Sequence, residues 1–223
     1  MLKFEKSRFF EVNSVFIENE IHTFAKKHHV IDWITIHYIE LIAALLGVTG
    51  VWLTTRQNIW CWPVGLLNVS LSMIVFFQSK LYYDFILQIF YFVLTIYGWI
   101  HWVHGKGKSI VLPVTKLRRA NILIAVVVTI CAVIILGRIA EIYTDAALPY
   151  WDAFTTAGGI FATFWMARKK IENWIAWIII DVVCTVIYIY KELYAFSVLY
   201  LIFAILAIIG YISWKKELKI IQK

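Results

Sequence analysis

Long apolar blocks, separated by short charged stretches, constrain the fold of this chain more than any other feature. Seven such blocks occur, at residues 38–54, 60–77, 83–103, 120–137, 148–167, 174–190 and 193–214. Each is close to the roughly 20 residues that a helix needs to cross the hydrocarbon core of a bilayer. None shows the alternating pattern of a barrel strand. Because 62% of the residues are hydrophobic and only 16% are charged, we predict an all-α membrane protein with seven transmembrane helices.

The basic residues gather at the ends of the predicted helices, and they explain the net charge of +7. If the loops alternate between the two sides of the membrane, one side carries 13 Lys and Arg residues and the other carries 3, or 8 with the N-terminal tail included. This asymmetry follows the positive-inside rule. We therefore expect a cytoplasmic C-terminus and an outside N-terminus, with membrane lipid as the partner and no binding of nucleic acid.

An internal repeat organises the chain, because related motifs recur at one constant separation along the sequence. Leu81-Tyr82 recurs as Leu193-Tyr194, Gly98 as Gly210, and Trp102 as Trp214. We call this shared separation, the one from Gly98 to Gly210, the repeat interval. Two copies of a three-helix unit joined by one linker helix have the same orientation in the membrane. The sequence thus predicts a 3+1+3 arrangement of parallel repeats, a known transporter design with its site between the halves.

The repeat divides the chain into five regions. Residues 1–37 form an N-terminal tail, which we interpret as an interfacial helix rather than a signal peptide because acidic residues interrupt its apolar runs. Residues 38–103 are the first repeat, and 104–140 are a basic loop followed by the linker helix. Residues 141–214 are the second repeat, and 215–223 are a cytoplasmic tail.

Polar and aromatic residues within the spans are the candidates for a binding site. Trp177 and Asp181 lie four residues apart, so they share one helix face. Asp181 is the least expected of these residues, because a carboxylate near mid-span is costly unless it faces a partner or a cavity. Aromatic faces stack on flat rings and attract cations, and amides pair with amides and hydroxyls. The candidate substrate-binding residues are Trp60, Asn68, Gln88, Tyr91, Trp165, Trp174, Trp177, Asp181 and Tyr200.

Structural explanations compete with these functional ones. Tryptophans near span ends anchor helices in the membrane interface, and Asn68 and Gln88 can form hydrogen bonds between helices. The His101/His104 pair fits an interfacial role better than a metal site. The stretch "GKGKS" at 105–109 lacks the first glycine of a phosphate loop. We therefore expect no catalytic residue, metal or cofactor.

Three stretches closely resemble the PnuC-type vitamin transporters: "WPVGLLN", "LYYDFILQIFYFVLTIYGWIHW" and "MARKKIENWIAWIIIDVVCTVIYIYKELYAFSVLY". The resemblance covers about residues 38–216. It implies a seven-helix 3+1+3 fold related in plan to the SWEET sugar transporters, and a homotrimer in the bacterial cytoplasmic (inner) membrane. It also implies facilitated diffusion of nicotinamide riboside by alternating access, with a cytoplasmic riboside kinase that makes uptake net. No ATP or ion coupling is expected.

Nicotinamide riboside is a planar cationic pyridinium that carries a carboxamide and a ribose, which suits the candidate residues. Relatives of this family carry thiamine, riboflavin or deoxynucleosides, and these substrates stay open. Two further classes also stay open: a SWEET-like sugar carrier and a receptor without transport. We expect that Trp177, with Trp174 or Trp60, stacks on the ring, and that Asn68 and Gln88 bind the carboxamide or the ribose.

Overall fold

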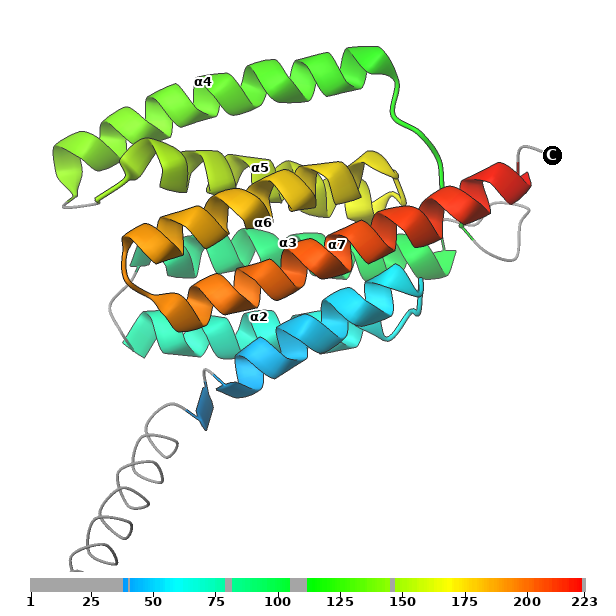
Figure 1. Cartoon of the computed structure of the whole chain (residues 1–223), viewed down its shortest axis with the longest axis horizontal. Helices are drawn as coiled ribbons and strands as arrows, with labels where there is room; N and C mark the ends of the chain where they lie inside the picture. Colours follow the sequence, from blue (N-terminus) through cyan, green and yellow to red (C-terminus); the bar gives the residue numbers. More distant parts are fainter. Residues whose placement is uncertain (1–37, 40, 79–81, 105–111, 145–146, 222–223) are drawn as a thin grey trace, which may run out of the picture. The chain divides into compact units, whose positions relative to one another are not determined.

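The computed structural model describes residues 38–39, 41–78, 82–104, 112–144 and 147–221, and its regular secondary structure there is helical. The helices are Leu41–Thr55, which we call the first helix, α2 (Cys61–Gln78), α3 (Tyr82–His104), α4 (Arg119–Tyr143), α5 (Pro149–Ala167), α6 (Glu172–Tyr190) and α7 (Tyr194–Ile221). They are shown in Figure 1. The predicted tail at 1–37 and the "GKGKS" stretch lie outside the described residues. The prediction of an all-α protein is confirmed.

Five of the described helices are long and apolar enough to cross a membrane: α2, α3, α4, α6 and α7. The first helix is shorter, and α5 is less apolar than the others because it is rich in Ala, Gly and Thr. Six residues of α5 are buried against protein: Ala153, Ala157, Gly159, Ala162, Thr163 and Ala167. A helix that faces other helices needs small residues for close packing rather than a lipid-facing apolar surface.

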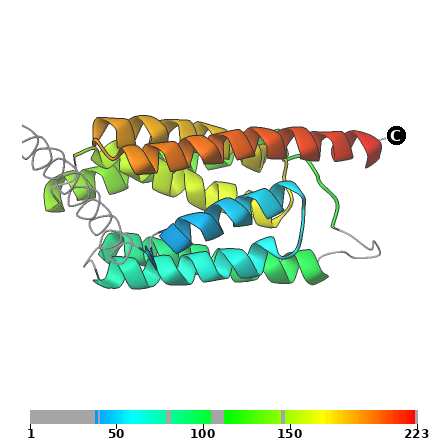
Figure 2. The same ribbon diagram turned by 60° about the horizontal axis from the view of Figure 1, so that its bottom comes forward.

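For description, we divide the helices of Ile42–Lys223, one compact unit, into two groups of three consecutive helices on either side of α4. The first group comprises the first helix, α2 and α3, and the second comprises α5, α6 and α7. Helix α2 packs against α3, and α6 packs against both α5 and α7. Helix α4 packs along α5 (Figure 1), where the Tyr150 ring lies directly over Gly137. Figure 2 shows α2 and α3 on one side and α6 and α7 on the other.

The same packing contact occurs once in each group. The Trp62 indole of α2 lies against Gly98 of α3, so closely that a methyl group at Gly98 would overlap the ring. The Trp174 indole of α6 lies in the same way against Gly210 of α7. The two tryptophans are separated by the repeat interval, and so are the two glycines. The absence of a side chain at each glycine therefore sets how closely the two helices of each group approach.

Contacts between the groups also come in pairs at this interval. A methyl group added at Gly47 of the first helix would come 3.3 Å from Cζ of Phe203 in α7. A methyl group added at Gly159 of α5 would overlap Oη of Tyr91 in α3. Gly159 follows Gly47 by the repeat interval, and Phe203 follows Tyr91 by the same separation. The first helix thus packs on the second group, and α5 packs on the first group.

The turns that precede α2 and α6 share a backbone feature. The first helix ends at Thr55 and α5 ends at Ala167, and a tight turn follows each. Gln57 in the first turn and Lys169 in the second both have a left-handed backbone, with φ of 54° and 50°. Side chains other than glycine rarely adopt this conformation. A short segment after α3 lies beside the second turn, where Thr115 N–H donates to Lys169 O (3.0 Å).

Candidate functional site: a polar cavity between the helix groups

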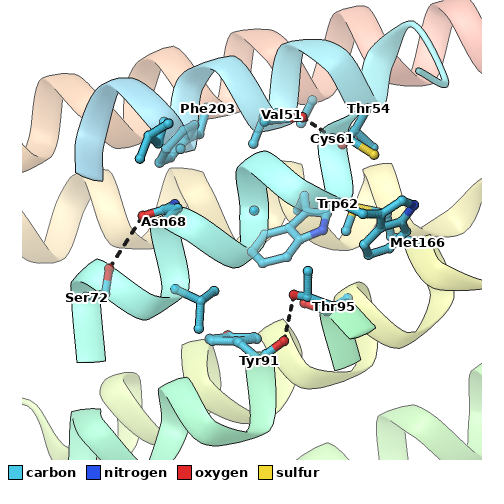
Figure 3. Close-up of a pocket in the computed structure, with 18 of the residues that line it drawn as sticks. Val51, Thr54, Cys61, Trp62, Asn68, Ser72, Tyr91, Thr95, Met166 and Phe203 are labelled. Carbon is cyan, nitrogen blue, oxygen red and sulfur yellow. Dashed lines mark hydrogen bonds between the residues drawn. The ribbon is translucent and has the colours of Figure 1, made fainter. Parts of the chain in front are cut away.

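A cavity of about 310 Å³ lies between the two groups, and six helices contribute to its wall. Its volume is within the range of small-molecule binding sites. The close-up in Figure 3 shows Asn68 and Trp62 of α2 and Tyr91 of α3 around this space. The lining residues are Leu46, Gly47, Gly50, Val51, Thr54, Cys61, Trp62, Gly65, Asn68, Val69, Ser72, Gln88, Tyr91, Thr95, Thr163, Met166, Trp174, Trp177, Asp181, Tyr200, Phe203 and Ala207.

Asp181 is the only acidic side chain among the described residues that line the cavity. It is 3% exposed, and Trp177 lies one helical turn before it on the same face of α6. The Asp181 backbone oxygen accepts a hydrogen bond from Thr185 Oγ1 (2.7 Å). Within the described residues no Lys or Arg forms an ion pair with Asp181. When ionised, a carboxylate in this position attracts a cation into the cavity.

Two amide side chains provide donors and acceptors on the side formed by the first group. Asn68 of α2 accepts a long hydrogen bond (3.5 Å) from Ser72 Oγ through Oδ1, one turn further along the same helix. Gln88 of α3 also lines the cavity. Together they can recognise a carboxamide or hydroxyl groups.

Two tyrosines complete the polar wall, and the packing around each fixes its ring. The Tyr91 hydroxyl lies against the backbone of α5 at Gly159, while the Tyr91 backbone oxygen accepts a hydrogen bond from Thr95 Oγ1 (2.6 Å). Tyr200 stacks on Tyr188, with ring centroids 5.1 Å apart and planes inclined by 14°. Phe203 meets Tyr200 edge-on at 5.9 Å. Such packing holds the rings in place without a bound molecule.

One end of the cavity is closed by four tryptophans, which we call the tryptophan layer: Trp62, Trp102, Trp174 and Trp214. Each is at most 4% exposed. Trp62 contacts Trp102 edge-on at 5.2 Å, and Trp174 contacts Trp214 edge-on at 5.3 Å. Trp102 and Trp214 join the two pairs, with centroids 6.2 Å apart. Of the four, Trp62 and Trp174 line the cavity, and the remaining two lie behind them.

Seven of the nine candidate residues come together in this cavity: Asn68, Gln88, Tyr91, Trp174, Trp177, Asp181 and Tyr200. Trp174 lies in the tryptophan layer, where its ring is fixed against Gly210 and Trp214.

Trp60 and Trp165 are not among the lining residues. Trp60 is 64% exposed in the turn before α2, where its backbone N–H donates to Asn58 Oδ1 (3.0 Å). Trp165 is half-buried and packs on Phe161 with ring centroids 6.1 Å apart. Comparison of the two repeats could have shown from the sequence that Trp62, and not Trp60, lines the cavity. Trp62 has Trp174 as its equivalent, whereas Trp60 has Glu172.

The two histidines at the end of α3 have separate surroundings. His101 stacks on Tyr97 with ring centroids 5.7 Å apart, and His104 Nδ1 lies 3.3 Å from Ile100 O. Among the described residues, no group of three His, Cys, Asp or Glu side chains could hold a metal ion.

A multi-helix membrane protein with a solute-sized cavity between two helix groups, lined by apolar residues and a few polar ones, fits the design of a transporter. Comparisons with known proteins agree. The family model of the nicotinamide mononucleotide transporters matches residues 37–216. The chain belongs to this family, and it is a membrane transporter rather than an enzyme.

Individual relatives are similar over most of the chain. The nicotinamide riboside transporter PnuC of Escherichia coli (strain K12) is 30% identical over 202 residues, which cover 79% of this chain and 84% of that protein. The riboflavin/roseoflavin transporter RibM of Streptomyces davaonensis is 28% identical over 182 residues, covering 78% and 83%. A crystal structure of the vitamin B3 transporter PnuC shares the fold with a TM-score of 0.68, at 20% identity, covering 85% of this chain and 86% of that one.

Proposed function

We propose that this protein takes up nicotinamide riboside, and that the substrate binds in the cavity between the two helix groups. The observation that carries the proposal is the pairing of Asp181 with the Trp177 ring on one face of α6, both in the cavity wall. A pyridinium ring is flat and positively charged, so it gains both from stacking on an indole and from a nearby carboxylate. The name of the Escherichia coli relative gives the same substrate.

The remaining lining residues fit the other parts of this molecule. Asn68 and Gln88 can pair with the carboxamide or with ribose hydroxyls. Tyr91 of α3 and Tyr200 of α7 add aromatic rings to the cavity wall. We do not include Trp60 and Trp165 in the proposed site, because neither lines the cavity.

We further propose that the two helix groups are parallel repeats joined by α4, in a 3+1+3 arrangement with the boundaries given by the sequence. The recurrence of the Trp–Gly contacts and of the left-handed turns at the repeat interval supports this arrangement. Rocking of one group against the other would then expose the cavity alternately to the two sides of the membrane.

We also propose passive transport in a homotrimer of the cytoplasmic membrane, with the C-terminus inside. Phosphorylation by a cytoplasmic kinase would remove the free substrate and make uptake net. The charge asymmetry of the loops supports the orientation, and the family resemblance supports the assembly and the passive mechanism.

Riboflavin is the second candidate substrate, because one relative is a riboflavin transporter. Its ring system is uncharged at neutral pH, so it gains no attraction from Asp181. Thiamine is cationic and remains compatible with the carboxylate. The charge of the cavity therefore favours a cationic substrate over riboflavin.

The experiment that tests the substrate is calorimetric titration of the purified protein with nicotinamide riboside, thiamine, riboflavin and a deoxynucleoside. We expect selective binding of nicotinamide riboside. Asp181→Asn should weaken that binding at least about tenfold, or ~1.4 kcal/mol, because it removes the charge and preserves the shape. Asp152→Asn is the matched control, since Asp152 is partly exposed and pairs with Lys191 outside the cavity. Tight binding of nicotinamide riboside by Asp181→Asn would contradict the proposed role of the carboxylate.

A further inference from the structure

The closed end of the cavity is built from contacts exchanged between the two helix groups. Trp102 Nε1–H of the first group donates to Ala167 O of the second (3.1 Å). Trp214 Nε1–H of the second group donates to Thr54 O of the first (3.2 Å). Both bonds are buried, and each reaches the last turn of a helix in the other group. Separating the groups at this end requires that both bonds break.

A buried lysine strengthens this junction. Lys169 is 2% exposed, and its Nζ donates to Gln57 Oε1 (2.7 Å). The same ammonium lies 4.5 Å from the centre of the Trp102 ring, a distance at which a cation is attracted to an indole face. Gln57 Nε2 in turn donates to Glu217 Oε2 of α7. We call Gln57, Lys169 and Glu217 the inter-group latch, because the chain of bonds runs from the second group to the first and back.

The backbone places the two central side chains of the latch in equivalent positions. Gln57 and Lys169 are separated by the repeat interval and share the left-handed conformation. Left-handed backbone at a residue other than glycine costs free energy and persists only where its surroundings enforce it. Each of these turns joins two helices of its own group, so a change in the position of either turn changes the contact between the groups.

The closed arrangement also has an energetic cost within the tryptophan layer. The indole N–H groups of Trp62 and Trp174 are buried and have no hydrogen-bond partner within the described residues. A buried donor without a partner destabilises the folded state. The two tryptophans are related by the repeat interval, so the cost falls on both sides of the layer. Closure therefore depends on the compensating contacts of the latch and of Trp102 and Trp214.

We propose that the inter-group latch is the gate at this end of the cavity, and that breaking the Lys169–Gln57 contact is required for substrate to pass the tryptophan layer. This inference rests on the proposed alternating access between the two groups. It gives the two basic turns a role beyond the charge asymmetry of the loops. Arg168 is exposed and Lys170 is half-buried, whereas Lys169 is buried against the other group. The gate lies on the side that we expect to be cytoplasmic.

Reversible cross-linking tests whether the two turns must separate. In a cysteine-free background, Gln57→Cys/Lys169→Cys is joined by a reducible bifunctional thiol reagent, and uptake of nicotinamide riboside into proteoliposomes is measured. The matched control is Asp152→Cys/Lys191→Cys, which replaces an ion pair (Nζ–Oδ1 3.2 Å) within the second group. We expect cross-linking to reduce uptake at least about tenfold in the first variant, with recovery on reduction, because one state is then locked. The control should lose less than about half of its uptake. Equal uptake by both cross-linked variants would overturn the proposal.

A second measurement follows the chemical modification of Cys61. It requires neither substrate nor transport activity in the cross-linked variant. Cys61 lines the cavity and belongs to the same buried cluster as the tryptophan layer. With Cys131 and Cys184 replaced by serine, the rate at which a small polar thiol reagent modifies Cys61 reports the opening of this end. Lys169→Met should raise that rate at least about fivefold, because the closed state loses its ammonium contacts. Lys216→Met, an exposed neighbour of Glu217, should leave it unchanged.

Modification of a second cysteine, Cys184, distinguishes opening of the gate from a general loss of structure. Cys184 is buried in a different cluster, with Ala162 and Ile180. In a background that retains Cys184 alone, its modification rate should be the same with and without Lys169→Met. An unchanged Cys61 rate, or a parallel rise at Cys184, would overturn the latch. If nicotinamide riboside is neither bound nor transported by the unaltered protein while the Cys61 response persists, the proposed substrate fails and the gate stands.

Discussion

At the scale of single residues, the cavity combines one carboxylate, two amides and two tyrosines with indole rings among its described lining residues. Asp181 has little exposure and no ion-pair partner in the part of the chain that the structure describes. A carboxylate at membrane depth is costly, and it is retained where it faces a polar cavity or a ligand. Residues around it are held by packing, as the stacked Tyr188 and Tyr200 rings show. Side chains held in this way lose less conformational entropy when a substrate binds.

The position of Tyr91 provides a test of this organisation. Gly159→Ala would place a methyl group where the Tyr91 hydroxyl lies, so the ring must move away from α5. We expect binding of nicotinamide riboside to weaken about tenfold, with a loss of about 1–3 kcal/mol in stability from overpacking. Gly158→Ala is the control, since its methyl group would lie 3.2 Å from the flexible end of Ile180. Titration and thermal unfolding of both variants measure the two effects, and equal affinities would contradict the assigned position of Tyr91.

The sequence predicted which residues of α6 face inward but not which tryptophan at the start of α2 does so. The spacing of Trp177 and Asp181 places both on one face, and the structure brings both to the cavity. Trp60 lies in the turn before α2 and Trp62 lies in the first turn of that helix. Helix propensity does not distinguish these two positions, because both tryptophans lie at the start of the same apolar run. The latch could not be read from local pattern either, because Lys169 stands within a basic stretch that resembles any cytoplasmic loop. Its burial depends on residues 57, 102 and 217, which only the folded chain brings together.

At the scale of helices, the sequence predicts where the membrane-spanning segments lie, and the structure corrects where some of them end. The bounds of α5 (Pro149–Ala167) differ by one residue from the predicted span at 148–167, because Pro149 suits the first helical turn. Helix α7 continues to Ile221, beyond the predicted end at 214. The extension is not explained by lipid contact, since Leu218 packs in the core beside Trp214 and Val114. Apolar periodicity detects the part of a helix that lies in lipid, and it misses a continuation that packs on a loop.

The recurring Trp–Gly contact predicts equal sensitivity in the two helix groups. Gly98→Ala and Gly210→Ala each place a methyl group inside an indole ring, Trp62 in one case and Trp174 in the other. Neither ring can shift easily within the tryptophan layer, so we expect each variant to lose about 1–3 kcal/mol of stability. Gly65→Ala serves as the control, because its methyl group would make ordinary contact with Thr95 Cγ2 at 3.5 Å. Thermal unfolding in detergent measures all three, and a large loss in only one group would count against equivalent packing.

At the scale of the whole molecule, the two helix groups share the cavity and meet at its closed end. Among the described residues, the polar contacts that join the groups at this end include two indole–carbonyl bonds, the Lys169 chain and the bond that Arg168 Nε donates to the Tyr97 hydroxyl. The groups also pack through α3 against α5, while the packing of α2 on α3 and of α6 on α5 and α7 lies within a group. A junction of few polar contacts between two well-packed bodies is suited to rigid-body motion, because opening it disrupts little of either core.

Passive transport makes a quantitative prediction for the complete protein in liposomes. If transport is passive, as we propose, the substrate gradient alone drives flux. With the membrane potential held at zero, internal nicotinamide riboside, a cation, should then rise only to the external concentration, whatever pH or sodium gradient is imposed. Enclosing a riboside kinase with ATP and Mg²⁺ should raise the total internal nicotinamide content above that level, because phosphorylation keeps the free substrate low. Liposomes with the kinase but without ATP are the control. At zero membrane potential, accumulation of the unmodified riboside above the external concentration under an ion gradient would show coupled transport and would contradict the passive mechanism.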